Sequence, residues 1–395
     1  MSKSAEGLQN CLNKLHSYSK LWGLTVNVNK TKTMVFNKGN RFINNVQFYF
    51  DNNLIETVKQ FTYVGVLITP NGKFKQNQNN LKNKAMKALF SIKKSILCER
   101  MLNPRLCLKL FDTLIAPILS YASEIWATEI KRTDNCLESI CMSFYRFILG
   151  VSKCTPLEGV RAELGRLPLK ISLYMSVIRY WCRLNSLPAN DILKKALTEN
   201  RKIQSPWVKF INQYMGSCDH MHVFSSLGVK SYCQLKKKMK ENFTRDYMDS
   251  WKRNLLDDTR KNGSGNKLRT YRIFKTQFVF EKYLEYLSDF TLCKHLCKFR
   301  LSDHNLGIEM GRKSKPRLPL NERICQRCDY NEIDDEFHLL FSCKNHTSER
   351  IILGQSSGTD FSQFYSHLEK EKIVKKLMEQ NILDLAVFLK STNVC

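Results

Sequence analysis

Residues 81–96 read LKNKAMKALFSIKKSI, and their apolar side chains recur at helical spacing. On a helical wheel, the apolar positions fall within an arc of about 100°: Leu81, Ala85, Ala88, Leu89, Ile92 and Ile96. The rest of the wheel is basic: Lys82, Lys84, Lys87, Lys93 and Lys94. The pattern predicts an amphipathic helix with one buried face. A solvated face is the ordinary interpretation of such lysines, but the near absence of balancing glutamate favours a surface that faces phosphates.

Working outward from this segment, apolar periodicity predicts further helices over 105–126, 136–149 and 171–184, with Gly150 ending the second. On the N-terminal side we expect one helix over 8–22 and then short strands near 24–28, 33–36, 46–50, 54–55 and 61–68. Helices are expected again over about 361–390. The fold class predicted is therefore mainly α, with a small N-terminal α+β part and a small zinc-binding unit.

Five regions are expected along the chain. A mixed α/β region covers 1–75 and a basic helical region covers 76–185. A less regular helical region follows over 186–266, ending in the linker-like Asn262-Gly263-Ser264-Gly265-Asn266. Residues 267–350 contain a basic segment and a cysteine cluster, and 351–395 form C-terminal helices.

The charge balance is unusual for a globular chain. The 395 residues include 63 Lys and Arg against 36 Asp and Glu, a net charge of +27. Such an excess attracts polyanions, of which RNA or DNA is the first candidate and an anionic membrane the second. The most apolar segment, 108–127, contains Lys109, Asp112, Pro117 and Glu124, so we expect a buried helix and no membrane partner. With 15 cysteines and no apolar leader, the thiols are expected to be reduced in the nucleus or cytoplasm.

The clearest chemical motif is Cys325-x2-Cys328-x9-His338-x4-Cys343. A CxxC turn lets two thiolates converge on one ion, and a His and a third Cys about one turn apart complete a tetrahedral set. Four filled positions indicate a structural zinc site without room for a catalytic water. The alternatives are core thiols without metal, or His346 as a substitute ligand.

Several segments resemble non-LTR (LINE-type) retrotransposon reverse transcriptases, from the end of the palm onward. Residues 4–9 and 22–36 resemble the block containing motif D, and 61–68 (FTYVGVLI) resembles motif E, the primer grip. Residues 81–169 then resemble the thumb. Residues 268–271, 300–306 and 335–338 with the cysteine cluster resemble the family's C-terminal region.

The resemblance implies roles for individual residues. Lys30 matches the motif D lysine, a general acid for the leaving pyrophosphate, and Tyr63 with Gly65 matches the primer grip. Arg300, His304 and Arg312 are expected beside the zinc unit, where they would contact RNA or DNA phosphates. Lys30, Tyr63, Gly65 and His304 also have ordinary alternatives: a surface lysine, a core tyrosine, a turn glycine and a structural histidine.

The family's catalytic carboxylates are not found in this sequence. Two-metal phosphoryl transfer needs an aromatic-x-Asp-Asp turn before motif D, and the Asp pairs at 257–258 and 334–335 have no such setting. No proline precedes an aspartate, so the motif of a restriction-like nuclease is also missing. The expectation is a truncated RNA-directed DNA polymerase that binds nucleic acid without polymerase activity, small-molecule substrate or Mg²⁺ of its own. The alternatives are a domesticated zinc-containing protein-interaction module, or part of an active enzyme whose catalytic half, with its Mg²⁺, lies outside this sequence.

Overall fold

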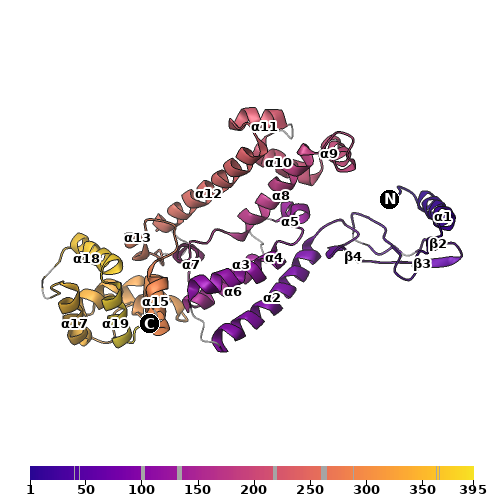
Figure 1. The fold of residues 1–395 in the computed structure, drawn as a ribbon. Helices are drawn as coiled ribbons and strands as arrows, with labels where there is room; N and C mark the ends of the chain where they lie inside the picture. The colour runs from indigo at the N-terminus through magenta and orange to yellow at the C-terminus, as the bar shows by residue number, and fades with distance from the viewer. Residues whose placement is uncertain are drawn as a thin grey trace.

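The computed structural model describes residues 1–395 except 40, 44, 99–102, 131–135, 217–219, 259–264, 288, 362 and 364. The protein is mainly helical, as the sequence predicts. A small α/β part containing the N-terminus lies at one end of the molecule, and the helices around the C-terminus lie at the other (Figure 1).

The N-terminal part packs one helix against a three-stranded sheet. Helix α1 (Ala5–Leu21) begins where the Ser4 side chain accepts a hydrogen bond from the Gly7 amide. The sheet has the order β1–β3–β2, with β1 (Lys32–Thr33) parallel and β2 (Phe48–Phe50) antiparallel to β3 (Asn53–Thr57). Its small core consists of Leu12, Phe48, Phe50 and Ile55.

The strand predicted at 24–28 does not form, and the one at 33–36 is reduced to Lys32–Thr33. The Asn27 side chain accepts a hydrogen bond from the Lys30 amide at 3.1 Å, and the Asn27 carbonyl accepts one from Thr31. These local bonds give the backbone an alternative to strand pairing, which explains the incorrect prediction.

A two-stranded hairpin connects this part to the helices. Strands β4 (Phe61–Tyr63) and β5 (Val66–Ile68) pair antiparallel, Phe61 opposite Ile68. The two turn residues, Val64 and Gly65, both have positive φ (45° and 77°), as tight hairpins require.

The amphipathic helix predicted over 81–96 is confirmed as the middle of α2 (Lys75–Cys98). The single helix predicted over 105–126 is wrong: the chain forms α3 (Pro104–Leu114), α4 (Ala116–Leu119) and α5 (Ser123–Trp126), followed by η1 (Ala127–Glu129). Pro117 has no amide hydrogen to continue the helix, and the axis bends by 42° between α3 and the segment that follows.

The remaining helices fall into a central and a C-terminal set. The central ones are α6 (Glu138–Leu149), α7 (Leu157–Glu163), α8 (Leu169–Ser186), α9 (Ile192–Lys202), α10 (Pro206–Met215), α11 (His220–Leu227) and α12 (Tyr232–Leu256). The C-terminal ones are α13 (Tyr271–Phe274), α14 (Tyr283–Tyr286), α15 (Phe290–Arg300), α16 (Gly307–Lys313), η2 (Leu320–Glu322), η3 (His338–Ser342), η4 (Lys344–His346), α17 (Thr347–Ser357), α18 (His367–Glu379) and α19 (Ile382–Ser391).

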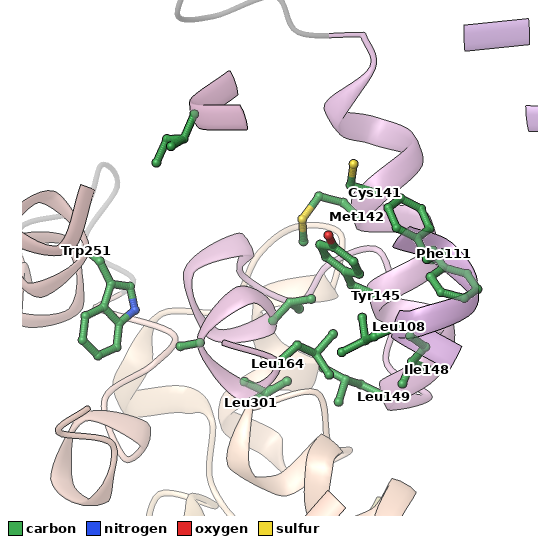
Figure 2. Close-up of a cluster of buried hydrophobic side chains, with 14 of the residues drawn as sticks. Leu108, Phe111, Cys141, Met142, Tyr145, Ile148, Leu149, Leu164, Trp251 and Leu301 are labelled. Atoms are coloured by element: carbon green, nitrogen blue, oxygen red, sulfur yellow. The ribbon is translucent and has the colours of Figure 1, made fainter. Parts of the chain in front are cut away.

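One contiguous core joins most of these helices. It extends from Leu81 to Val394, so the boundaries expected at 185, 266 and 350 fall inside it. Figure 2 shows side chains of α3 and α6, including Phe111 and Tyr145, on the same cluster as Leu301 from the C-terminal part. Gly165 has a φ of 59°, and a Cβ there would lie 2.7 Å from the backbone of Phe280. Only glycine permits this close approach of the two segments.

No single helix among the described residues is long and apolar enough to cross a membrane. The bent pair Pro104–Leu114 and Ala116–Glu129 meets the requirement of length and composition. Its apolar residues Phe111, Ile115, Leu119 and Trp126 lie in the protein core, each with at most 1% of its surface exposed.

Candidate metal centre and nucleic-acid interface

The four predicted metal ligands converge on one point. The Sγ atoms of Cys325, Cys328 and Cys343 and a ring nitrogen of His338 all lie within 4.8 Å of one another. The Cys325 and Cys343 sulfurs are 3.9 Å apart, and the Cys328 sulfur is 3.3 Å from Nε2 of His338. Donors at about 2.0–2.3 Å from a tetrahedral ion would be separated by about 3.5–3.8 Å. The group can therefore hold a metal ion.

The first two ligands lie in a tight loop. Ile324 and Ile333 form an isolated antiparallel bridge, and the Cys325 amide donates to the Glu332 carbonyl at 2.9 Å. Asn331 turns the loop with a φ of 52°. The Arg327 amide donates to the Cys325 sulfur at 3.4 Å. These backbone hydrogen bonds position Cys325 and Cys328 without the help of a metal ion.

The other two ligands are brought together by a π-helical turn. The Cys343 amide donates to the His338 carbonyl at 2.8 Å, an i→i+5 bond at the end of η3. The sequence predicts the pair on one turn of an ordinary helix. The wider π turn accommodates their five-residue separation.

The orientation of the His338 ring is fixed by Glu332. Nδ1 lies 2.8 Å from the Glu332 carboxylate, while Nε2 faces the Cys328 sulfur. A proton held on Nδ1 by the carboxylate leaves the Nε2 lone pair free for a cation. The nitrogens of His346, the alternative ligand, are not among the converging atoms.

Burial favours the protonated form of Cys343 in this cluster. Burial first, and then the neighbouring Cys325 thiol, raise the pKa of Cys343 to about 11. A divalent cation reverses this preference, because it stabilises the thiolates that ligate it.

Arg300 is not available to bind phosphates, contrary to the sequence prediction. Its side chain is 2% exposed and lies 2.9 Å from the carboxylate of Glu163 and 3.1 Å from that of Glu281. Its guanidinium also stacks on Phe274 and Tyr283, at 4.6 and 4.9 Å from the ring centres. Burial alone would raise the pKa of Glu163, but Arg300, Lys275 and Tyr283 together hold that pKa below the usual range. Arg300 is a core residue.

His304 is also buried, with none of its side chain exposed. Its Nε2 lies 2.9 Å from the Glu336 carboxylate, which also binds Arg269 at 2.7 Å. The sequence prediction that His304 contacts nucleic acid is therefore not supported by its position.

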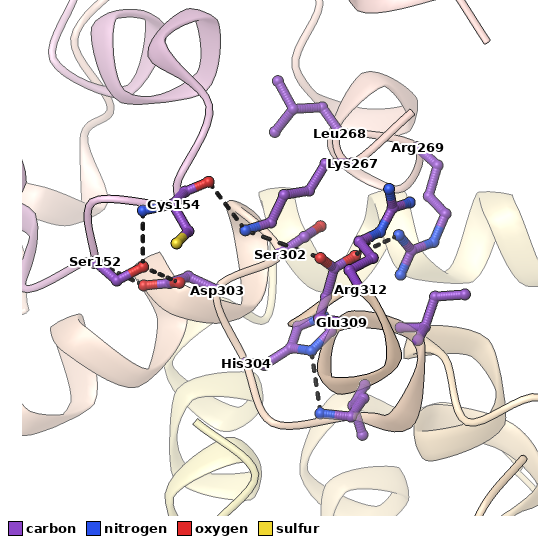
Figure 3. Close-up of polar contacts among 12 residues, drawn as sticks. Ser152, Cys154, Lys267, Leu268, Arg269, Ser302, Asp303, His304, Glu309 and Arg312 are labelled. Atoms are coloured by element: carbon purple, nitrogen blue, oxygen red, sulfur yellow. Dashed lines mark hydrogen bonds and ion pairs between the residues drawn. The ribbon is translucent and has the colours of Figure 1, made fainter. Parts of the chain in front are cut away.

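Arg312 belongs to the same buried network. Its Nε is 3.2 Å from Glu309, and Arg269 reaches that carboxylate at 2.8 Å. Figure 3 shows Lys267, Arg269 and Arg312 gathered around Glu309. Glu309 and Arg312 are three residues apart on α16, but nothing in the sequence indicates that Glu309 also meets the distant Lys267 and Arg269.

A second contact joins the helical part to the C-terminal part. Asp303 accepts hydrogen bonds from the amide and hydroxyl of Ser152, at 2.6 and 2.5 Å (Figure 3). Lys267 donates to the Cys154 carbonyl at 3.2 Å. The loop after α6 is thus held by residues more than 100 positions away.

The predicted lysine face of α2 is present but contains fewer free lysines than expected. Lys84, Lys87 and Lys94 are exposed, and Lys82 is half-buried. Lys93 donates to the Ser143 carbonyl and hydroxyl, both at 3.1 Å, and its ammonium lies 5.0 Å from the centre of the Phe147 ring. Burial lowers the pKa of Lys93. Lys93 therefore fastens α2 to α6, and the free face consists of the other lysines.

The residues matched to polymerase motifs lie in the N-terminal part and the hairpin. Lys30 is exposed in the turn after Asn27. The side chain of Tyr63 is 63% exposed beside the hairpin turn. A Cβ on Gly65 would lie 3.0 Å from the Tyr121 ring, whose hydroxyl donates to the Val64 carbonyl at 2.9 Å. Packing against Tyr121 therefore explains the glycine at position 65 without a contact to a primer.

The paired aspartates are engaged in structural contacts. Asp258 pairs with Arg272 at 2.9 Å. Asp334 accepts from the Gly307 amide at 2.6 Å and pairs with Arg327, and Asp335 accepts from the His338 amide at 2.8 Å. None of these pairs forms an open two-carboxylate site.

Two features of the described residues therefore have functional chemistry: a closed four-donor centre and a lysine-rich outer face on α2. The centre has its four ligands from the protein and is suited to holding structure together. The α2 face is suited to attracting polyanions. No protein-family model matches this chain, and no match was found among the curated proteins or the solved structures.

Proposed function

We propose that this protein binds RNA or DNA through the lysine face of α2 and holds a structural zinc ion at Cys325, Cys328, His338 and Cys343. The observation that supports binding most directly is α2 itself. It has 24 residues, six of them lysines, and contains no aspartate or glutamate. A protein surface of this kind gains affinity for nucleic acid by releasing the counterions of the phosphates.

Zinc is the proposed metal because three thiolates and one imidazole are its preferred ligands in structural sites. When bound, it would cross-link the loop after Ile324 to η3. Such sites contribute to folding free energy and need no catalytic role.

We further propose that the chain is the C-terminal part of a non-LTR retrotransposon reverse transcriptase. The support is the order of the motif D-like, motif E-like and cysteine-rich segments in the sequence. Lys30, Tyr63 and Gly65 would then be polymerase residues only together with catalytic carboxylates from another region. Sequencing the locus upstream tests this. An in-frame aromatic-x-Asp-Asp turn supports the family assignment, and an upstream frame that encodes an unrelated protein contradicts it.

A salt titration with matched variants tests nucleic-acid binding. Log affinity should fall with log salt by about 0.7–0.9 per phosphate contact. The triple variant Lys84→Glu, Lys87→Glu, Lys94→Glu should lose binding at low salt. The control variant Lys3→Glu, Lys14→Glu, Lys20→Glu makes the same change in net charge in and around α1 and should retain it. Equal loss in both variants would contradict a localised site, and no binding by the native protein at low salt would contradict the function.

A protein-interaction module is the second candidate, and one groove favours it. The groove, of about 240 Å³, lies between α5, α8, α9 and α10 and includes Ile125, Leu193 and Trp207. Ile125 and Leu193 remain 46% and 42% exposed. If the protein acts only as such a module, charge reversal on α2 should leave its affinity for a protein partner unchanged.

A further inference from the structure

One outward face of α2 combines cations with apolar side chains. Lys87, Phe90, Lys94 and Leu97 follow one another at spacings of three and four residues, which places them on one side of the helix. We call these four residues the α2 stripe. Phe90 is 67% exposed and Leu97 is 59% exposed. The opposite side of α2 is buried in the core, so the direction of the stripe is fixed.

The two lysines of the stripe are free to bind an anion. Among the residues that the structure describes, neither Lys87 nor Lys94 has an ion pair, whereas Lys93 is fastened to Ser143. A single exposed phenylalanine would need no explanation on its own. Here Phe90 lies between Lys87 and Lys94 in the stripe, on a helix without a single carboxylate.

We propose that the α2 stripe binds single-stranded nucleic acid, with an unpaired base stacked on Phe90 and phosphates held by Lys87 and Lys94. This inference rests on the proposed function and narrows it to one substrate class. The two lysines are separated by about 10 Å along the helix axis, and their flexible stems can reach the phosphates on either side of one nucleotide.

The ring is the feature that selects single strands. Bases in a duplex are already stacked on each other, so an outward phenyl group meets only sugar and phosphate. An unpaired base offers its free face to an aromatic side chain, a contact that contributes about 1–3 kcal/mol per base. Leu97, one further turn along, extends the apolar surface for a neighbouring base.

The test compares Phe90→Ala, Phe90→Trp and the control Phe42→Ala, an exposed phenylalanine outside α2 and outside the segments that resemble polymerase motifs. Fluorescence anisotropy measures the affinity of each for a single-stranded oligouridylate and for an RNA duplex of equal length. Phe90→Ala should weaken single-strand binding about tenfold and leave duplex affinity and the salt slope unchanged. Phe90→Trp should retain affinity, and its added fluorescence should be quenched by the single strand. Because Phe90 is exposed, these substitutions open no cavity in the core.

Three outcomes would overturn the inference, and they are distinguishable. If the Lys84, Lys87, Lys94 charge reversal abolishes binding but Phe90→Ala has equal effects on single strands and duplex, stacking is wrong and the proposed function stands. If the native protein binds neither nucleic acid at low salt, both are wrong. If Phe90→Ala loses binding to vesicles of anionic phospholipid while oligonucleotide binding is unchanged, the stripe is a membrane contact.

Discussion

Replacing Arg300 by methionine distinguishes a core role from a nucleic-acid role for this residue. The sequence predicts a phosphate contact, whereas the structure places its guanidinium 2.9 Å from Glu163 and 3.1 Å from Glu281. Both Arg300 and Glu163 have side chains at most 2% exposed. Arg300→Met retains most of the apolar stem and removes the charge, so Glu163 is left buried without its main partner.

The expected loss of stability follows from this burial. Two unit charges about 4 Å apart interact by about 4 kcal/mol at an effective dielectric constant near 20. Breaking a buried pair on one side typically costs about 3–5 kcal/mol. Glu163 retains a hydrogen bond from the Tyr283 hydroxyl. We therefore expect the free energy of unfolding to fall by about 3 kcal/mol, the lower end of that range.

The pH dependence of this loss has a definite sign. In the native protein the pKa of Glu163 is below its usual 4.5, so its contribution is present above that pH and disappears as pH falls through the lower folded value. In Arg300→Met, burial is opposed by Lys275 and Tyr283 but no longer by the arginine, so the pKa of Glu163 is higher than in the native protein. Its buried charge then destabilises the fold at neutral pH and is neutralised as pH falls. The stability gap between the native protein and the variant should narrow from pH 7 towards pH 5.

Urea unfolding followed by circular dichroism measures both effects. Arg179→Met is the control, because Arg179 is exposed and donates a hydrogen bond to the nearby Ser176 on its own helix. Adding Glu163→Gln to Arg300→Met should recover part of the loss, since it removes the unpaired charge. If Arg300→Met unfolds like the native protein but loses affinity for RNA or DNA, the sequence-based role is right and the structural argument is refuted.

Further predictions concern the metal centre and α2. Cys328→Ser should abolish stoichiometric zinc in elemental analysis and lower the unfolding temperature, whereas the exposed Cys233→Ser should do neither. Glu332→Gln should weaken zinc affinity by about 10–100-fold in a competition titration, because the carboxylate orients His338; an unchanged affinity would contradict that role. Lys93→Ala should lower the free energy of unfolding by about 1 kcal/mol and leave RNA affinity unchanged. Lys94→Ala should leave the free energy of unfolding unchanged, weaken RNA binding and reduce the salt slope by about one. Equal effects of the two substitutions on stability and on affinity would contradict the distinction between Lys93 and Lys94.

The sequence was sufficient for features that depend on local spacing. The buried face of α2 and the end of α6 at Gly150 follow from helical periodicity and from the glycine's positive φ. The four metal ligands are also local, because a short loop and one turn bring them together. Each of these depends on residues fewer than 20 positions apart.

Features that depend on distant residues could not be predicted. Arg300 is the last residue of α15 and looks like a free basic residue until α7 and Phe274 are placed around it. The π turn of η3 could not be read from spacing, because Cys343, five residues after His338, fits either kind of helix approximately. Pro117 itself indicates the break in the helix predicted over 105–126, but the apolar periodicity on both sides of it favoured one continuous helix.

The basic residues behind the net charge of +27 include two classes, those paired with buried carboxylates and those free on the surface of α2. In and beside the C-terminal part, buried carboxylates pair with basic residues, most of which come from distant segments. Glu163 of α7 pairs with Arg300, Glu336 pairs with Arg269, and Glu309 pairs with Lys267, Arg269 and the neighbouring Arg312. On α2 there is no carboxylate to gather them, so Lys84, Lys87 and Lys94 remain free. Substitutions in the first class should mainly lower the free energy of unfolding. Substitutions in the second class should mainly weaken the affinity for nucleic acid. The class of a basic residue thus depends on the carboxylates that contact it in the fold. Only for α2 does the sequence alone show that the helix has no carboxylate of its own.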